Sequence, residues 1–292
     1  MMIDLHIHST YSDGTDNIID ILKQAENLNL DIISITDHES CDAYQEINKI
    51  DVRKYFSGKI ITGIELKTQY NDGIVDILGY NINCDKMKNY LSECYKKISR
   101  EKIQEKKLEE FYKYGEQYGL ILRPIQELIW DKKKDWGSIV FYNEMKSHEE
   151  NKSKVPADLW ESFKNFKQNY YKIKGKMFYV NMSKDYPTFD EIISIIHNSG
   201  GLAFIAHIYE YTWMEDKLNE LKLMGEKLDG VECYHSSFTE EQIEKLIQFS
   251  KENNLLMSGG SDYHGTNKPY INLGTGQGIL KVPKNIIENW QI

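Results

Sequence analysis

The chain has 292 residues and a formal net charge of −9, and 40% of its residues are hydrophobic. This length suggests one large domain or a domain with an insertion, and the composition excludes disordered and fibrous proteins. No apolar run reaches the roughly 18 to 20 residues of a membrane span and no signal peptide is visible, so we expect a cytoplasmic protein without a membrane partner. The negative charge argues against a long nucleic-acid duplex as partner. A small or short anionic substrate stays possible if a local cation attracts it.

Short apolar strands alternate with amphipathic helices over the first ninety residues. We expect strands at 2–8, 31–36, 59–66 and 73–82, and a helix that begins near Thr15 and Asp16. Strands rich in Ile and Val that are separated by helices favour a largely parallel α/β sheet with the helices on its outer face.

The middle of the chain, residues 85–182, differs in kind. It is rich in Lys, Glu and Tyr, and its helical periodicity predicts a mainly helical insertion or cap. Aromatic residues of this segment, such as Tyr112, Trp136 and Trp160, can stack on a nucleic-acid base. Aromatic residues at helical spacing nevertheless form a core more often than a binding platform.

The α/β pattern returns after residue 183. Thr188 is expected to begin one helix, and Thr239 with Gln242 to form a capping box at the start of another. Further strands are expected at 201–207, 229–235 and 255–260. About seven strands in total favour a (β/α) barrel, made by residues 1–84 and 183–292 around the insertion, over an open sheet.

Histidines and carboxylates accompany the ends of the predicted strands. These residues are His6, His8, Asp13, Asp37, His38, Glu65, His207, His235, Asp262 and His264. In a parallel barrel all strand C-termini open on one face, so these side chains would converge. His6 and His8 lie two apart on a strand, which suits two imidazoles on one metal ion. An isolated H-x-H is more often an ordinary polar pair, but its recurrence with further ligands favours two or three divalent ions.

The order and spacing of six motifs resemble the PHP family, named after polymerases and histidinol phosphatases. The motifs are DLHIHSTYSDGT at 4–15, ITDHES at 35–40, TGIEL at 62–66, DILGYNI at 76–82, GGLAFIAH at 200–207 and GGSDYHG at 259–265. The chain is most similar to a bacterial branch that carries a helical insertion and hydrolyses nucleotide phosphates or short oligonucleotides. The resemblance implies a distorted seven-stranded, TIM-like barrel with a site for three metal ions.

The resemblance also implies a role for each clustered residue. It assigns a first metal to His6, His8, Glu65 and Asp262, a second to Glu65 and His207, and a third to Asp13, His38 and His264. Asp76 stands where the family usually has a histidine, and as a carboxylate it would make the second site favour Mn²⁺ or Mg²⁺ more than a histidine-rich site does. The candidate ions are Mn²⁺, Fe²⁺, Zn²⁺ and Mg²⁺. Asp37 is expected to orient an imidazole. The role of His235 is inferred from its place after a strand near the barrel mouth rather than from the resemblance. From that place it can contact the substrate or donate a proton, and the alternatives are that it supports another site residue or lies on the surface.

The implied reaction is hydrolysis of a phosphomonoester or terminal phosphodiester by water that the metal ions activate. A nucleotide, nucleoside bisphosphate or short oligonucleotide is the expected substrate. The insertion lacks the Gly-Arg-Pro-His-like element common in the nucleotide-phosphatase branch, so other readings stay open. These are a phosphatase of histidinol phosphate or another small molecule, a metal-dependent hydrolase of C–N or lactone bonds, and a non-catalytic metal-binding module.

Overall fold

The structure, a computed structural model, describes residues 2–95, 100–132 and 135–290. Its strands are β1 (Met2–Ile7), β2 (Leu30–Ile35), β3 (Lys59–Ile60), β4 (Gly63–Tyr70), β5 (Gly73–Tyr80), β6 (Leu202–Ile205), β7 (Gly230–His235) and β8 (Leu256–Gly260). Its α-helices are α1 (Ile18–Asn27), α2 (Asp42–Ile47), α3 (Cys84–Cys94), α4 (Arg100–Gln117), α5 (Gly137–Lys146), α6 (Ala157–Glu161), α7 (Phe163–Phe166), α8 (Phe189–Asn198), α9 (Lys217–Met224) and α10 (Glu240–Glu252). Within this described part, no helix combines the length and the apolarity that crossing a membrane requires.

The chain forms two compact units. The first consists of Met1–Cys94 and Pro187–Ile292, and the second of Tyr95–Tyr186. The sequence predicts that the inserted unit begins at residue 85 and ends at residue 182. The difference at the first limit is helix α3, which packs against α8 and so belongs to the first unit.

The strands of the first unit form two sheets rather than one. Strands β1, β2 and β3 pair in parallel, and β4 to β8 pair in sequence order in a second sheet. The expectation of a largely parallel sheet is wrong at β4 and β5, because β5 pairs antiparallel with both β4 and β6. The cause is the two-residue turn Asn71-Asp72, in which Asn71 has a φ of 49°. Asparagine tolerates this left-handed conformation, which is common in tight hairpins.

The two sheets meet at both edges without a continuous ladder between them. An isolated bridge joins Ile7 to Tyr263, and another joins His38 to Glu65. The fold is therefore mixed α/β, which confirms the expected class. The ladders of the described residues do not form the closed seven-stranded barrel that the sequence favours.

A buried hydroxyl helps to join the two sheets at the second edge. Tyr44, on α2, donates to the carbonyl oxygen of Ile35 at 2.7 Å and accepts from the backbone N–H of Gly63 at 2.8 Å. Ile35 ends β2 and Gly63 begins β4. Because the side chain of Tyr44 is only 4% exposed, water cannot easily replace these contacts.

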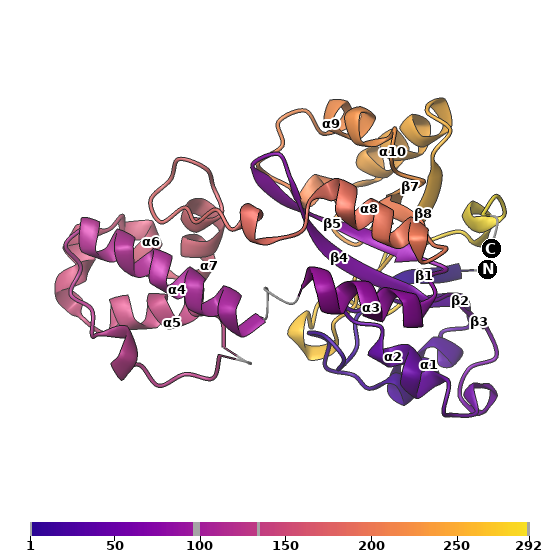
Figure 1. Cartoon of the computed structure of the whole chain (residues 1–292), viewed down its shortest axis with the longest axis horizontal. Coiled ribbons are helices and arrows are strands. Elements are labelled where there is room, and N and C mark those ends of the chain that lie inside the picture. Colours follow the sequence, from indigo (N-terminus) through magenta and orange to yellow (C-terminus); the bar gives the residue numbers. More distant parts are fainter. Residues whose placement is uncertain (1, 96–99, 133–134, 291–292) are drawn as a thin grey trace. The chain divides into compact units, whose positions relative to one another are not determined.

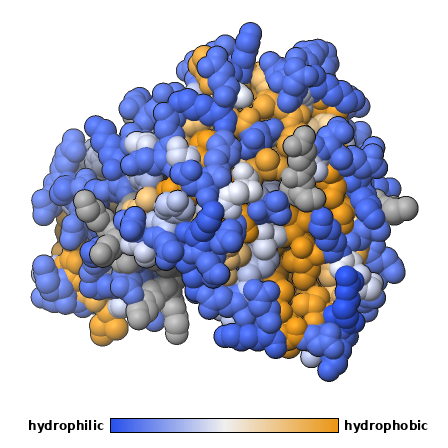
Figure 2. All heavy atoms as spheres, turned by 45° about the vertical axis from the view of Figure 1, so that its right-hand side comes forward, coloured by the Kyte–Doolittle hydropathy of each residue, from blue (hydrophilic) through white to orange (hydrophobic). Residues whose placement is uncertain are grey.

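The helices of the first unit cover the outer faces of the sheets (Figure 1). Helices α1 and α2 bury Ile18, Ile21 and Tyr44 against β2. Helices α8 and α10 lie along the second sheet. Thr188 begins α8, as predicted, and forms a capping box with Glu191, whereas the capping box of Thr239 at the start of α10 was itself predicted. Most of the surface visible in Figure 2 is hydrophilic, with some hydrophobic residues gathered between the hydrophilic ones.

The second unit has an aromatic core of its own. Phe111 on α4, Phe141 on α5 and Phe166 on α7 are fully buried, and their ring centroids lie 5.2 to 6.1 Å apart. Tyr112 and Trp160 join the same cluster. The interpretation as core is thus confirmed for Tyr112 and Trp160, but it is wrong for Trp136, which is 42% exposed and is not part of this cluster.

Candidate metal centre

The ends of strands from both sheets bring a group of histidines and carboxylates together. All nine predicted metal ligands lie in this cluster: His6, His8, Asp13, His38, Glu65, Asp76, His207, Asp262 and His264. They fall into overlapping sets whose ligand atoms lie within 4.8 Å of one another. Most members are buried, whereas the side chains of Asp13, His38 and Asp76 are 33%, 20% and 14% exposed. One side of the cluster is therefore accessible to a substrate.

Glu65 lies in the middle of the cluster. Its Oε2 lies 3.3 Å from His6 Nε2 and 3.2 Å from both His8 Nε2 and His38 Nδ1. Its Oε1 accepts from His207 Nε2 at 3.0 Å. One carboxylate thus contacts imidazoles that come from the ends of three strands.

Asp13 organises the more exposed side of the cluster. Its carboxylate lies 3.3 Å from His264 Nε2, 3.7 Å from His8 Nδ1 and 3.8 Å from His38 Nε2. These four residues form one candidate ligand set.

Asp262 lies on the other side of Glu65. Its Oδ1 is 3.4 Å from His8 Nε2, 3.6 Å from His6 Nε2 and 3.4 Å from His264 Nδ1. Asp262 has a φ of 58°, which a residue with a β-carbon rarely adopts. Strain of this kind is typical of functional sites, where the surrounding structure maintains it.

Several atoms of the cluster have no hydrogen-bond partner although they are buried. Among them are His6 Nε2, His8 Nε2 and Asp13 Oδ1. Buried polar atoms are nearly always satisfied, so a group of unsatisfied nitrogen and oxygen atoms that face one another needs an explanation. Divalent cations bind such imidazole and carboxylate atoms, and the residues therefore fit a metal site.

The charge of Glu65 supports the same conclusion. Burial alone would raise the pKa of its carboxyl group, but the neighbouring imidazoles of His38 and His6 hold that pKa well below its usual range. Glu65 is therefore ionised at neutral pH and provides a negative charge for a cation.

Comparison with known proteins identifies this arrangement. The chain matches the PHP domain over residues 4–257. It belongs to the PHP family. As a PHP-domain protein it is a hydrolase of phosphate esters, the class that the sequence predicts.

Relatives of this PHP-domain protein extend over its whole length. It is 24% identical to the 5'-3' exoribonuclease Rnm of Salmonella typhimurium, over 100% of this chain and 93% of that protein. It is 23% identical to a phosphoribosyl 1,2-cyclic phosphate 1,2-diphosphodiesterase of Eggerthella lenta, over 91% of this chain and 95% of the relative. The crystal structure of a candidate metal-dependent phosphoesterase from Bifidobacterium adolescentis aligns with a TM-score of 0.65 at 20% identity, over 98% of this chain and 94% of that one.

Asp37 supports the loop that follows β1 in the PHP site. Its carboxylate accepts from the backbone N–H and the hydroxyl of Ser9 at 2.7 and 2.6 Å, and from the hydroxyl of Ser12 at 2.5 Å. Ser12 Oγ in turn lies 3.5 Å from His8 Nδ1. Within the described residues, Asp37 thus reaches an imidazole through Ser12 rather than directly.

Glu232 is a buried residue of the site that the sequence analysis missed. Its Oε1 accepts from His6 Nδ1 at 2.9 Å, and its Oε2 accepts from the backbone N–H of His207 at 2.7 Å. It thereby fixes the ring of His6 and holds His207 in an unusual conformation with a φ of 24°. A signal was present, because a lone carboxylate inside the apolar strand GVECYH must have a buried partner.

Two lysines at the edge of the cluster were also missed. Lys268 forms an ion pair with Asp262, and its side chain is 33% exposed. Lys67, 29% exposed, lies 3.4 Å from Asp76 Oδ1 and donates to His38 Nδ1 at 2.9 Å. Lysine is an unusual neighbour for a metal ligand, because its ammonium group repels a metal cation.

His235 ends β7 beside the cluster. Its Nε2 lies 3.5 Å from Asp262 Oδ2, and its Nδ1 lies 2.8 Å from the hydroxyl of Ser237. The two remaining histidines lie elsewhere. His148 pairs with Glu144 in the second unit, and His197 pairs with Asp229.

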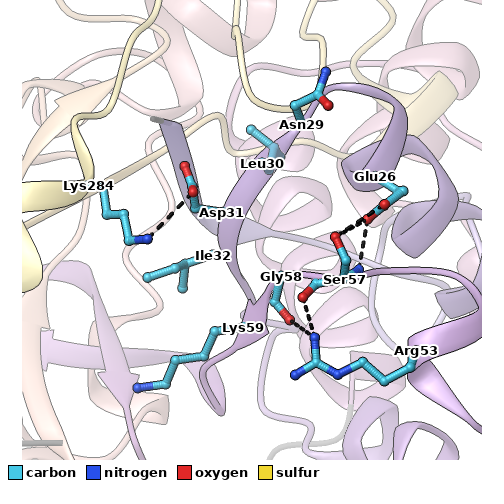
Figure 3. A pocket seen from close by; sticks show the side chains of 10 residues that line it. All are labelled: Glu26, Asn29, Leu30, Asp31, Ile32, Arg53, Ser57, Gly58, Lys59 and Lys284. Atoms are coloured by element: carbon cyan, nitrogen blue, oxygen red, sulfur yellow. Dashed lines mark hydrogen bonds and ion pairs between the residues drawn. The ribbon is translucent and has the colours of Figure 1, made fainter.

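A separate pocket of about 570 Å³ lies at the start of β2 and β3, the opposite end of these strands from the cluster (Figure 3). Several of its charged groups are already paired. Arg53 donates to the backbone carbonyl oxygen of Gly58. Glu26 accepts from the backbone N–H of Ser57. Lys284 Nζ lies 3.5 Å from Asp31 Oδ1. The chemistry of the PHP cluster is therefore not in this pocket.

Proposed function

We propose that this PHP-domain protein removes nucleotides from the 5' end of short single-stranded RNA by hydrolysing the terminal phosphodiester bond. The observation that carries the proposal is the cluster of unsatisfied imidazole and carboxylate atoms around Glu65. Similarity to 5'-3' exoribonucleases over the whole of this chain supports the choice of substrate.

In this proposal the cluster holds two or three divalent ions, of which Mn²⁺, Fe²⁺, Zn²⁺ and Mg²⁺ are the candidates. The proposed ligands are eight of the nine that the sequence predicts: His6, His8, Glu65 and Asp262, then Asp13, His38 and His264, and finally His207 together with Glu65. The ninth, Asp76, forms an ion pair with Lys67. Bound divalent ions activate water and neutralise the charge that develops on a phosphoryl group. The negatively charged carboxylates of Glu65, Asp13 and Asp262 would bind these cations. The local positive charge of the ions would then attract a phosphate group, although the net charge of the protein is negative.

Other residues of the chain contribute binding and proton transfer. The partly exposed ammonium groups of Lys67 and Lys268 can each attract a phosphate oxygen. The imidazole of His235 faces Asp262 and can give a proton to the leaving oxygen. Asp37 and Glu232 act as positioning residues, because they fix the loop after β1 and the ring of His6.

The test uses a short RNA that carries a 5' phosphate and a 3' label, incubated with Mn²⁺ and the full-length protein. We expect stepwise shortening from the 5' end with the parent and a loss of at least a hundredfold with His8→Ala, which removes an imidazole from the cluster. His197→Ala is the matched control, because His197 lies outside the cluster and pairs with Asp229. Unchanged RNA shortening by a folded His8→Ala protein would contradict the proposed role of the cluster.

A small cyclic or terminal phosphate is the second candidate substrate. The similarity to a phosphoribosyl cyclic phosphate diphosphodiesterase over 95% of that protein supports it. Release of phosphate from nucleotides or cyclic phosphates, without shortening of RNA, would favour this candidate. Hydrolysis of amides or lactones alone would favour the C–N or lactone alternative instead.

A further inference from the structure

Lys67 and Asp76 lie directly opposite each other in the hairpin of β4 and β5. They are partners in the antiparallel register, on the face of the hairpin that borders the cluster. Lys67 Nζ lies 3.4 Å from Asp76 Oδ1. Side chains that face each other across antiparallel strands interact directly, so the register itself holds this ion pair in place.

The ammonium group of Lys67 also enters a candidate ligand set. His38, Glu65 and Asp76 form one of the sets whose ligand atoms lie within 4.8 Å of one another. Lys67 Nζ contacts two of these three residues, since it also donates to His38 Nδ1 at 2.9 Å. A divalent ion that used Asp76 would therefore lie next to a fixed positive charge.

Lys67 Nζ lies nearer to His38 Nδ1, at 2.9 Å, than to His38 Nε2, at 3.4 Å. His38 Nε2 also lies 3.8 Å from Asp13, and Asp13 in turn lies 3.3 Å from His264. A metal ion at the set of Asp13 has His8, Asp13 and His264 as candidate ligands in addition to His38. An ion beside Asp76 would instead have to share both Asp76 and His38 with the ammonium group of Lys67.

Both ammonium groups at the cluster are paired with carboxylates of its candidate sets. Lys67 pairs with Asp76, and Lys268 pairs with Asp262. The positive charge beside Asp76 is thus present without a metal ion, and a divalent ion placed there would be repelled by it.

We propose that Lys67 takes the place of one metal ion, so that Asp76 binds an ammonium group and the centre holds two ions instead of three. This inference rests on the proposed function only in assuming that the cluster binds metal. Lys67 then supplies a positive charge that needs no metal, at the accessible side of the cluster.

The test measures bound Mn²⁺ per chain by elemental analysis after the full-length protein has been equilibrated with Mn²⁺ and desalted. We expect about two ions in the parent and the same number in Asp76→Asn, because Asp76 is not a metal ligand in this proposal. Lys67→Ala vacates the position beside Asp76, and we expect it to gain about one further ion. Lys67→Arg is the matched control and should keep the parent's number, since it retains a cation.

The outcomes separate this inference from the proposed function. Three ions in the parent and two in Asp76→Asn would overturn the role of Lys67 while leaving a metal-dependent enzyme. An unchanged number in a folded Lys67→Ala protein would also overturn it. No bound Mn²⁺ in the parent, or no loss in His8→Ala, would instead refute the metal centre itself. Circular dichroism of each variant shows whether it is folded.

Discussion

Replacing Glu232 by glutamine tests how the cluster is positioned. The carboxylate accepts two hydrogen bonds, one on each oxygen, from His6 Nδ1 at 2.9 Å and from the backbone N–H of His207 at 2.7 Å. An amide has only one acceptor oxygen, so in either orientation of the glutamine its NH₂ group must face one of these two donors. The variant therefore loses one of the two contacts with almost no change of shape.

The expected magnitude follows from the charge of Glu232. Burial would raise the pKa of its carboxyl group, but the imidazole of His6 lowers it below the usual value, so the group is ionised. A hydrogen bond to a charged group contributes about 1.5 to 3 kcal/mol, which corresponds to roughly a 10- to 150-fold change in an equilibrium constant. Loss of a carboxylate that orients a metal-binding histidine typically weakens metal affinity by about 10- to 100-fold. We therefore expect Glu232→Gln to bind Mn²⁺ about 10- to 100-fold more weakly.

The assay is a competition for Mn²⁺ between the protein and a chelating dye of known affinity. The exposed Glu226, changed to glutamine, serves as the matched control and should leave the affinity unchanged. Urea unfolding of both variants shows whether the protein is folded under the conditions of the competition. A Mn²⁺ affinity of folded Glu232→Gln within twofold of the parent would refute the reasoning, because the contact with His6 would then have no effect on the metal.

Two further predictions concern stability. Glu144→Gln should lower the free energy of unfolding of the second unit by about 1 to 3 kcal/mol at neutral pH, because the buried carboxylate accepts from Arg123 at 2.7 Å. Burial would raise the pKa of the Glu144 carboxyl group, but Arg123 and His148 lower it below its ordinary value of 4.5. The contribution of Glu144 to the free energy of unfolding is therefore fully present above pH 4.5, and it is lost as the pH falls through the pKa of the folded state. Urea unfolding at several pH values checks this, and a difference between parent and variant that persists in acid would contradict it. Tyr44→Phe should destabilise the first unit by about 1 to 3 kcal/mol, since the buried N–H of Gly63 loses its acceptor; equal urea midpoints of variant and parent would show that the hydroxyl does not help to join the sheets.

Some of the site could be predicted from general rules, and some only from the resemblance. His6, His38 and Asp262 lie at or just after the ends of parallel strands, so the rule that such ends meet on one face is sufficient to bring them together. Glu65 and Asp76 lie inside an antiparallel hairpin, to which that rule does not apply. Glu65 was expected in the cluster as the end of a parallel strand, a premise that the antiparallel pairing shows to be wrong. The place of Asp76 followed from the family motifs alone.

The missed features have physical causes. The hairpin was missed because two apolar runs of Ile, Val and Leu look alike in parallel and antiparallel sheets, and the turn at Asn71 was the only local sign of a reversal. Lys67 was missed because its contact with Asp76 depends on the antiparallel register. Glu232 was missed because its two partners, His6 and His207, are distant in sequence.

The contacts of Asp4 have a consequence for the order of folding. This buried carboxylate accepts from Ser261, 257 positions later in the chain, and from Gly274, 270 positions later. These contacts fix the segment that carries Asp262 beside β1, and contacts so distant in sequence form slowly because a long loop must close first. During synthesis, His6 and His8 emerge early and must wait until the second unit and β8 have been made. The ligand sets that use Asp262 or His264 can thus assemble only after β8 has been made, and a nascent chain that stops before β8 lacks these two ligands although it already contains His6, His8 and Glu65.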